Sequence, residues 1–367
     1  MSVYNDKRSA ESYTKPQLFL GDEMGLLDTI HHHYPELWQL YKQMKSLDWD
    51  ENEFDYAKCL VEFETCDPVV AEMMKKTLTW QWEADSVVSR TPAALIAPFC
   101  SSTELFAAEL RISDNETLHA ATYSEIVRLS FTDPKLVLSE MLAVKETIGR
   151  MNSVVSFLNE FQKQSHEYAL YGLNGEPKQW WLGQIIKFYF IMYLLERVQF
   201  MASFAITFTI CEADIFQPIG TAVQKIAQDE LEIHCEFRKA VLARIRETEE
   251  GQAAFEYVYN DLENFYKEVI QSEFEWIDYL FSGGKSLTGT NPEKLKQWVL
   301  FNAQHIDNFA GFSYNGTTLY DYPVKNPMPH LDDWFNLSSF QPAPQEQAIN
   351  QYKAVSVRND AEMLDIL

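Results

Sequence analysis

Glycine and proline are scarce in this chain, which has only 13 glycines and 14 prolines among its 367 residues. Because these two residues interrupt regular structure, the long stretches between them favour extended helices over many short strands and turns. Hydrophobic residues make up 46% of the chain, which is ample for a large buried core. The composition therefore predicts an all-α protein.

Cysteine is also limited, and the pattern of cysteines argues against a protein stabilised by disulfides. The five cysteines include no Cys-x-x-Cys pair, and an odd number does not suit a complete disulfide framework. The first residues lack the continuous apolar segment of a secretory signal. Both observations favour a reducing, cytoplasmic location.

Positively charged residues are few: the chain has 30 lysines and arginines and 54 acidic residues, which gives a net charge of -24. An acidic surface argues against broad binding to nucleic acid or to an anionic membrane. In the most apolar region, residues 180–216, the longest uncharged run is 198–211, which is too short to span a bilayer. We therefore expect no nucleic-acid or membrane partner, and a buried helix at the centre of a bundle.

Helical periodicity covers most of the chain. Apolar residues recur at helical spacing over residues 68–89, 102–130, 134–170, 182–210, 217–247 and 252–281. Because the connections are short, neighbouring helices should be antiparallel, and we expect one bundle domain over residues 1–322 that includes an N-terminal arm. Residues 323–367 are expected to form a Pro-containing, flexible tail, whose apolar last residues suit docking to a partner.

A first group of polar residues, Glu116, His119 and Tyr123, shares one face of a helix. Three residues advance a helix by about 300° and seven by about 700°, so the three side chains project in similar directions on successive turns. A Glu-x-x-His pair alone is weak evidence for a metal site, because such pairs occur by chance in many helices.

A second group lies at residues 225–234. Glu230 and His234 are four residues apart and share a face, whereas Glu232 is rotated by about 200° from His234 and points away. Taken alone, this segment would be a solvated acidic face. Glu230 is the better ligand candidate.

Each group is preceded by a single acid at the distance that one helix, a turn and part of an antiparallel helix require. Asp85 lies 31 residues before Glu116, and Glu196 lies 34 residues before Glu230. Four carboxylates and two histidines from four helices match the dimetal arrangement of ferritin-like bundles. Four carboxylates neutralise two divalent cations, and one imidazole for each metal completes such a site.

Several segments resemble, in the same order, the small, radical-generating subunit of class I ribonucleotide reductase. They are ADSVVSR with Asp85, ETLHAATY with Glu116, His119 and Tyr123, LERVQF with Glu196, IAQDE with Glu230, and the late segments NPMP and APQE. The resemblance extends over most of the chain. It implies a ferritin-like helical bundle with a dimetal-carboxylate site in a four-helix core.

The resemblance also implies a role for each residue. The first metal would be bound by Asp85, Glu116 and His119, and the second by Glu196, Glu230 and His234. Tyr123 would hold the radical, in an apolar pocket made by Phe200, Phe204 and Ile226. Trp49, Asp229 and the tail residue Tyr352 would transfer the oxidising equivalent to the large subunit. An ordinary buried tyrosine and ordinary core residues are the alternatives.

One spacing departs from the family. In the family, the second glutamate and the second histidine are usually three residues apart, whereas Glu230 and His234 in this chain are four residues apart. A π-bulge rotates four residues by about 327°, close to the rotation of three residues in an α-helix, so the ligand geometry would survive.

By this resemblance, the chain would be the small subunit of ribonucleoside-diphosphate reductase. Its dimetal centre would activate oxygen and form a tyrosyl radical, which the large subunit uses to reduce ribonucleotides. The metals would be iron first, with manganese or mixed Mn/Fe as alternatives, and the subunit would form a homodimer. A di-iron oxygenase or desaturase and an iron-storage bundle remain open. The run His31–His33 is interpreted as surface or capping.

Overall fold

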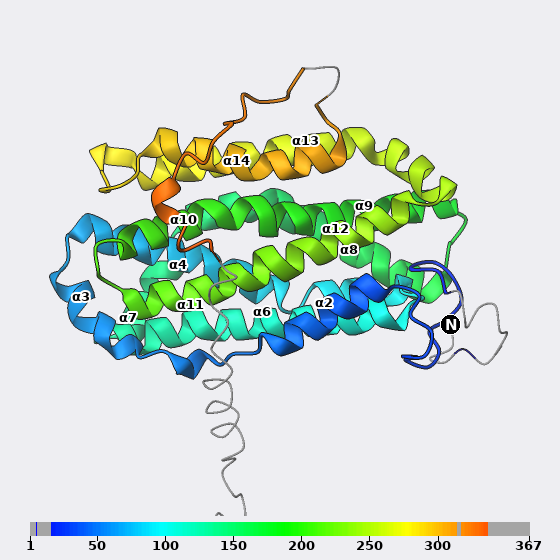
Figure 1. Ribbon diagram of the computed structural model, residues 1–367, viewed down its shortest axis with the longest axis horizontal. Coiled ribbons are helices and arrows are strands. Elements are labelled where there is room, and N and C mark those ends of the chain that lie inside the picture. Colours follow the sequence, from blue (N-terminus) through cyan, green and yellow to red (C-terminus); the bar gives the residue numbers. More distant parts are fainter. Residues whose placement is uncertain (1–4, 6–15, 314–316, 337–367) are drawn as a thin grey trace, which may run out of the picture.

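The computed structural model describes residue 5 and residues 16–313 and 317–336, and long helices running side by side along the long axis dominate this part (Figure 1). The α-helices are α2 (Pro35–Ser46), α3 (Cys59–Thr65), α4 (Pro68–Val88), α5 (Pro92–Ile96), α6 (Thr103–Ser130), α7 (Pro134–Leu142), α8 (Lys145–Tyr171), α9 (Lys178–Leu194), α10 (Phe200–Cys211), α11 (Gln217–Gln228), α12 (Cys235–Arg246), α13 (Glu249–Leu280) and α14 (Pro292–Ala310). Within the described residues, β-pairing is limited to isolated bridges. The predicted all-α fold is confirmed.

The starts of four long helices are encoded locally. The Asp67 side chain accepts a hydrogen bond from the backbone at the start of α4, and Ser102, Thr248 and Asn291 do the same for α6, α13 and α14. Such caps satisfy amide groups that have no partner inside the helix. Pro68 and Pro292 occupy the first helical position, where a missing N–H costs nothing.

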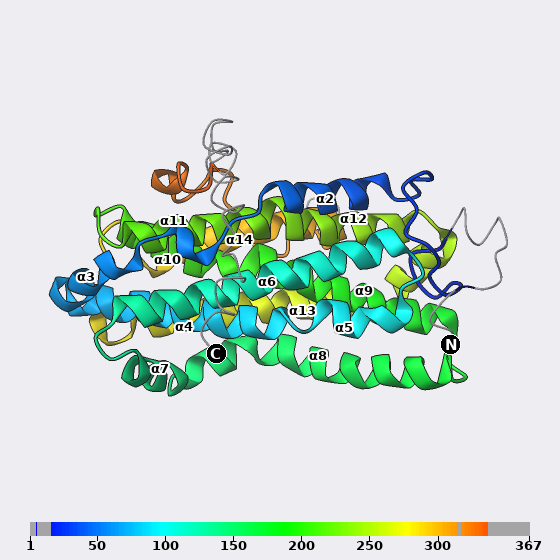
Figure 2. The same ribbon diagram turned by 90° about the horizontal axis from the view of Figure 1, so that it is seen from below.

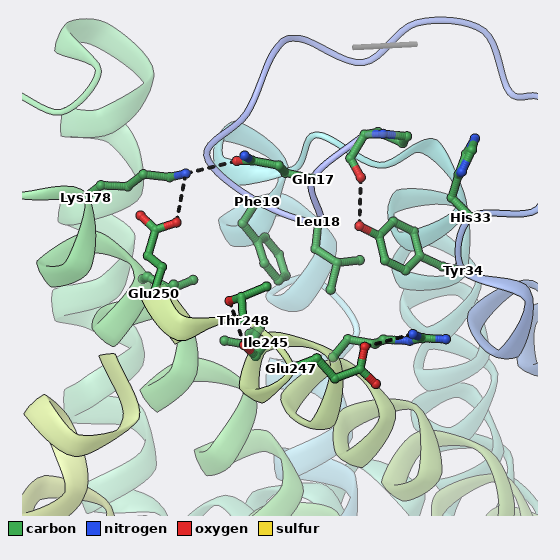
Figure 3. Close-up of a pocket in the computed structure, with 13 residues that line it drawn as sticks. Gln17, Leu18, Phe19, His33, Tyr34, Lys178, Ile245, Glu247, Thr248 and Glu250 are labelled. Atoms are coloured by element: carbon green, nitrogen blue, oxygen red, sulfur yellow. Dashed lines mark hydrogen bonds and ion pairs between the residues drawn. The ribbon is translucent and has the colours of Figure 1, made fainter. Parts of the chain in front are cut away.

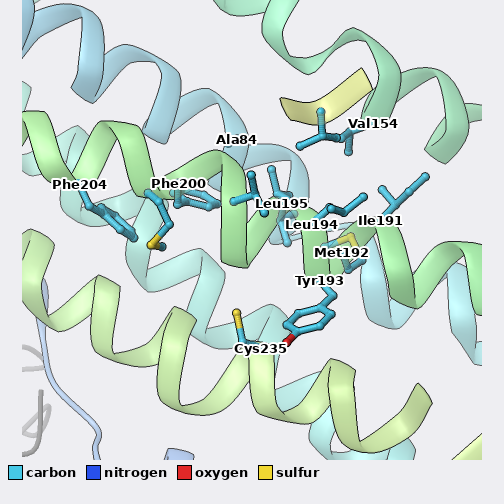
Figure 4. Close-up of a cluster of buried hydrophobic side chains, with 14 of the residues drawn as sticks. Ala84, Val154, Ile191, Met192, Tyr193, Leu194, Leu195, Phe200, Phe204 and Cys235 are labelled. Carbon is cyan, nitrogen blue, oxygen red and sulfur yellow. The ribbon is translucent and has the colours of Figure 1, made fainter. Parts of the chain in front are cut away.

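The apolar region predicted to be a buried helix is the centre of the molecule. Helix α9 continues through a π-helical turn, η4 (Leu195–Gln199), into α10. By length and composition this continuous helix could cross a membrane, but 94% of its most apolar 18-residue window is buried inside the protein. Figure 4 shows side chains from both sides of the turn, such as Met192 and Phe204, within one apolar cluster. It is a core helix.

Four helical rods surround the predicted site. Helix α4 packs against α6, α10 packs against α4, and η4 contacts a second π-helical turn, η5 (Asp229–His234), which joins α11 to α12. Figure 2 shows α6 lying between α4 and the α11–α12 rod. Helix α13 packs along α9. The expected four-helix core is therefore present.

The structure corrects the predicted boundaries in three places. The helix expected over residues 134–170 is two helices, because Val144 has an extended backbone between them. Helices α2 and α14 were not among the predicted segments. The predicted tail also begins inside packed structure, since Leu331 is buried and the Trp334 ring stacks on Phe208 at 5.0 Å. Residues 337–367 lie outside the described part.

Candidate metal centre

The six candidate ligands come from the four central rods and are all buried. Asp85 lies near the end of α4, Glu116 and His119 lie in the middle of α6, Glu196 lies in η4, and Glu230 and His234 lie in η5. The long intervals between them in the sequence are closed by antiparallel packing. The structure therefore brings all six together.

These residues form two overlapping groups that could each hold a metal ion. One contains Asp85, Glu116 and His119, and the other contains Glu116, Glu196, Glu230 and His234; in each, the potential ligand atoms lie within 4.8 Å of one another. Glu116 belongs to both groups. A carboxylate has two oxygens, so Glu116 can face two cations at once.

Both imidazoles point their Nδ1 atoms at the carboxylates. His119 Nδ1 lies 3.4 Å from Glu116 Oε2 and 3.2 Å from Glu230 Oε1. His234 Nδ1 lies 3.2 Å from Glu116 Oε1 and 3.3 Å from Glu230 Oε2. Glu116 and Glu230 thus each lie within 3.4 Å of both histidines.

The opposite nitrogen of each imidazole is held by an outer partner. His119 Nε2 lies 3.1 Å from Asp229 Oδ2, and His234 Nε2 lies 3.2 Å from Asn115 Oδ1. Asn115 also donates to Asp229 Oδ2, at 3.1 Å. In metal sites such partners fix the orientation of the ring and its tautomer. Asn115 was missed by sequence reasoning, although it precedes Glu116 and lies one turn before His119.

Trp49 covers the His119 side of this network. Its indole Nε1 donates to Asp229 Oδ2 at 2.8 Å, and its ring stacks on His119 with centroids 6.1 Å apart. The predicted pairing of Trp49 with Asp229 is therefore present. Tyr352, the third residue of the predicted transfer chain, lies outside the described residues.

The unusual spacing of Glu230 and His234 has a backbone cause. Both lie in η5, a π-helix over Asp229–His234, so the suggested π-bulge is confirmed. A wider turn takes up the extra residue and leaves both side chains on one face. The second π-helix, η4 around Glu196, was not predicted, because Glu196 has no partner ligand nearby in the sequence to reveal the register.

Buried polar atoms without hydrogen-bond partners converge at this point. They are both carboxylate oxygens of Asp85 and Glu196 Oε2, together with Glu116 Oε2, Glu230 Oε1 and His119 Nδ1, which contact one another as ion-pair partners without forming a hydrogen bond. An unsatisfied buried polar atom costs about 1–3 kcal/mol, and more when it is charged. Oxygen and imidazole ligands suit divalent cations such as iron and manganese. The residues present therefore fit two metal ions.

The charges in the protein alone are poorly balanced. Burial, reinforced by Glu116, raises the pKa of Asp85 well above its usual value, and burial raises the pKa of Glu196 to about 8. Burial would also raise the pKa of Glu116, but its close contacts with His119 and His234 outweigh burial and lower that pKa to about 2. Divalent cations would supply the missing positive charge and favour ionised carboxylates throughout.

Tyr123 lies one turn beyond His119 on α6 and is fully buried. Its hydroxyl group has no hydrogen-bond partner. Burial, followed by the charge on Asp85, raises the pKa of Tyr123 well above its usual value. The phenol is therefore neutral across the physiological pH range.

The three residues of the predicted apolar pocket are also buried. Phe200 and Phe204 lie on α10 with ring centroids 5.4 Å apart, and Ile226 lies on α11. Figure 4 shows the two phenylalanines side by side in the apolar cluster. Phe200 also contacts Trp80 of α4 edge-on, at 4.9 Å.

A second missed residue, Arg238, lies one turn beyond His234 on α12. It is fully buried, and its Nε donates to Glu196 Oε1 at 3.1 Å. Glu109 and Tyr189 complete its surroundings. A helical projection continued past His234 would have placed Arg238 on the ligand face, but not beside Glu196.

A surface pocket of about 400 Å³ near the N-terminal region contains none of the candidate ligands (Figure 3). Its cations already have partners, since Lys178 contacts Gln17 and Glu250, and Arg244 contacts Glu247. His33 lines this pocket, while His31 and His32 are exposed. The surface location expected for the histidine run is therefore confirmed for these two residues.

Comparison with known proteins identifies one family for most of the chain. The family model described as "Ribonucleotide reductase, small chain" matches residues 28–313, which include all six candidate ligands and Tyr123. The ribonucleoside-diphosphate reductase subunit beta of Buchnera aphidicola is 24% identical over 379 residues, covering 99% of this chain and 97% of that relative.

Solved structures share the fold. The ribonucleotide reductase R2 subunit from Clostridium botulinum is 16% identical with a TM-score of 0.73, covering 91% of this chain and 98% of that one. The dimanganese(II)-NrdF protein of Streptococcus sanguinis is 14% identical with a TM-score of 0.62, covering 85% of this chain and 99% of that one.

Proposed function

The chain belongs to the family of ribonucleotide reductase small chains, and on this premise we propose that it generates the radical for a ribonucleoside-diphosphate reductase. The observation that carries the proposal is the pair of overlapping ligand groups one helical turn from a buried tyrosine. A di-iron oxygenase, a desaturase and an iron-storage bundle would share the ligand types. Family membership favours the reductase over these alternatives.

Two metal ions are assigned to the cluster. Asp85, Glu116 and His119 hold the first ion, and Glu196, Glu230 and His234 hold the second. When bound, redox-active metals supply the oxidising power by activating oxygen, which no side chain here could provide. Iron is the first candidate. Manganese and mixed Mn/Fe are the alternatives, because the same ligands suit both metals and a structural relative is described as dimanganese.

Tyr123 is assigned as the residue that loses an electron and a proton to become the radical. Its neutral hydroxyl group, without a hydrogen-bond partner, keeps the proton until oxidation occurs. Phe200, Phe204 and Ile226 are assigned to exclude water and external reductants from the radical. The exclusion of water from this pocket would then determine the lifetime of the radical.

The oxidising equivalent leaves through Trp49 and Asp229 in this proposal. Asp229 accepts the Trp49 N–H and also contacts His119, so one carboxylate connects an aromatic side chain to a ligand. The partner is the large subunit, which holds the ribonucleotide. Tyr352 and the last residues of the chain are assigned to transfer and docking, and the helical body is assigned to a cytoplasmic homodimer.

Electron paramagnetic resonance tests the central assignment. Protein loaded with ferrous iron or manganese and exposed to oxygen should give a tyrosyl signal that disappears in Tyr123→Phe while both metals stay bound. The matched control is Tyr56→Phe, because Tyr56 is another buried tyrosine whose hydroxyl group has no partner. A tyrosyl signal that persists in Tyr123→Phe would refute the radical assignment.

A further inference from the structure

Arg238 is a buried cation in direct contact with one of the assigned ligands. Its Nε donates to Glu196 Oε1 at 3.1 Å. On its other side, Nη1 donates to both oxygens of Glu109 at 2.8 and 2.9 Å, and the Tyr189 hydroxyl donates to Glu109 Oε1 at 2.7 Å. A chain of hydrogen bonds therefore runs from α9 through α6 and α12 to η4.

The charge of Arg238 is already balanced without Glu196. A buried guanidinium is tolerated only when it is paired and hydrogen-bonded, and Glu109 supplies a carboxylate that is itself fully buried. The fixed fork of the guanidinium directs Nη1 at Glu109 and Nε at Glu196. The bond to Glu196 therefore fixes the direction of that carboxylate in addition to the ion pair.

This contact makes the two oxygens of Glu196 unequal. Oε1 accepts from Arg238, whereas Oε2 is buried without a partner. Carboxylates can bind a cation through one oxygen or through two. We propose that Arg238 is a positioning residue that restricts Glu196 to coordination through Oε2 alone, an inference that rests on the metal assignment above.

Asp85, the corresponding acid of the other half, is not restricted in this way. Both of its carboxylate oxygens are buried without hydrogen-bond partners. The two carboxylates therefore differ in conformational freedom. Asp85 can rotate or bind through both oxygens, whereas the hydrogen bond from Arg238 fixes the orientation of Glu196. The two metal positions are made unequal by a residue that is not itself a ligand.

A crystal structure of the Mn²⁺-loaded protein tests the inference directly. We expect one Glu196 oxygen on the ion, with Arg238 Nε still bonded to the other. In the double variant Arg238→Met with Glu109→Gln, which removes both buried charges together, both Glu196 oxygens should reach the ion. Unchanged one-oxygen binding in this variant would overturn the role of Arg238, as would two-oxygen binding in the wild-type protein.

Infrared difference spectra of the Mn²⁺-loaded proteins provide a solution measurement. Release of Glu196 should narrow the separation between its two carboxylate stretching bands in the double variant and in Arg238→Lys, whose amine lacks the fork. Tyr189→Phe is the matched control, because it removes a bond to Glu109 but keeps Arg238 on Glu196, so its bands should not move. Identical spectra in all variants would contradict the inference.

Metal content distinguishes a failure of the ligand assignment from a failure of the role of Arg238. If the wild-type protein binds no Mn²⁺ at the cluster, the proposed function loses its ligand assignment. If it binds two ions while Glu196 uses both oxygens, only the role of Arg238 fails.

Discussion

The two halves of the cluster reach similar ligand arrangements on different backbones. Asp85, Glu116 and His119 lie on regular α-helices, whereas Glu196, Glu230 and His234 lie on π-helical turns. Three residues of α-helix and four of π-helix rotate by about 300° and 327°, so both spacings present a glutamate and a histidine together. Ligand spacing in a sequence is therefore meaningful only together with the helix type.

Deleting one residue from each half gives the largest expected contrast. Deleting Leu118 should rotate the rest of α6 by about 100° and turn Tyr123 and Ile126 out of the core, destabilising the protein by more than about 5 kcal/mol. Deleting Glu232 should convert the π-turn into an α-turn and preserve the fold. Urea denaturation, monitored by circular dichroism, measures the free energy of unfolding of both deletion variants. An equal loss of stability in the two deletion variants would contradict this difference between the two halves.

Neutralising one ligand in each half should separate shared from unshared carboxylates. Glu116→Gln removes a member of both groups, so metal content should fall from about two ions to less than one, whereas Glu196→Gln should leave about one ion. Elemental analysis after dialysis gives the count. Glu232→Gln is the control, since this acid lies on the same turn but bonds Gln228 instead of the cluster. An equal loss in both ligand variants would argue against sharing.

Asn115 connects the halves, and its removal should have an intermediate effect. Asn115→Leu breaks the contacts with Asp229 and His234, and loss of such an outer partner typically weakens metal binding about 10–100-fold. Mn²⁺ titration monitored by paramagnetic resonance of the free ion measures this. Asn302→Leu, at another buried asparagine, should leave affinity unchanged. Wild-type affinity in Asn115→Leu would show that the connection is dispensable.

The smallest expected effect is on stability at Tyr123. Its hydroxyl group has no partner, so Tyr123→Phe should change the free energy of unfolding by less than about 1 kcal/mol. Tyr266→Phe should cost more, because that hydroxyl group bonds Ala303 and Tyr322. Thermal denaturation of both variants compares them. A large loss in Tyr123→Phe would reveal a partner for its hydroxyl group.

The sequence predicted most of the helical framework because apolar residues recur at helical spacing along helices such as α4 and α6. It could not locate the break at Ala143–Val144, since neither residue is a helix breaker and the break separates α7, which packs on α6, from α8, which packs on α13. The approach of the six candidate ligands followed from helical spacing. Asn115 and Arg238 did not, because their partners are distant in the sequence and depend on how the rods face each other.

Trp49 determines how the cluster is closed from outside. It is 8% exposed and lies in the stretch 47–58 between α2 and α3, where only short 3₁₀ turns occur and most side chains are exposed. Segments with few buried contacts open locally at a lower free energy than the whole protein. Local opening of this stretch would remove Trp49 from His119 and uncover that side of the cluster, and amide hydrogen exchange at residues 47–58 would report the free energy of the opening.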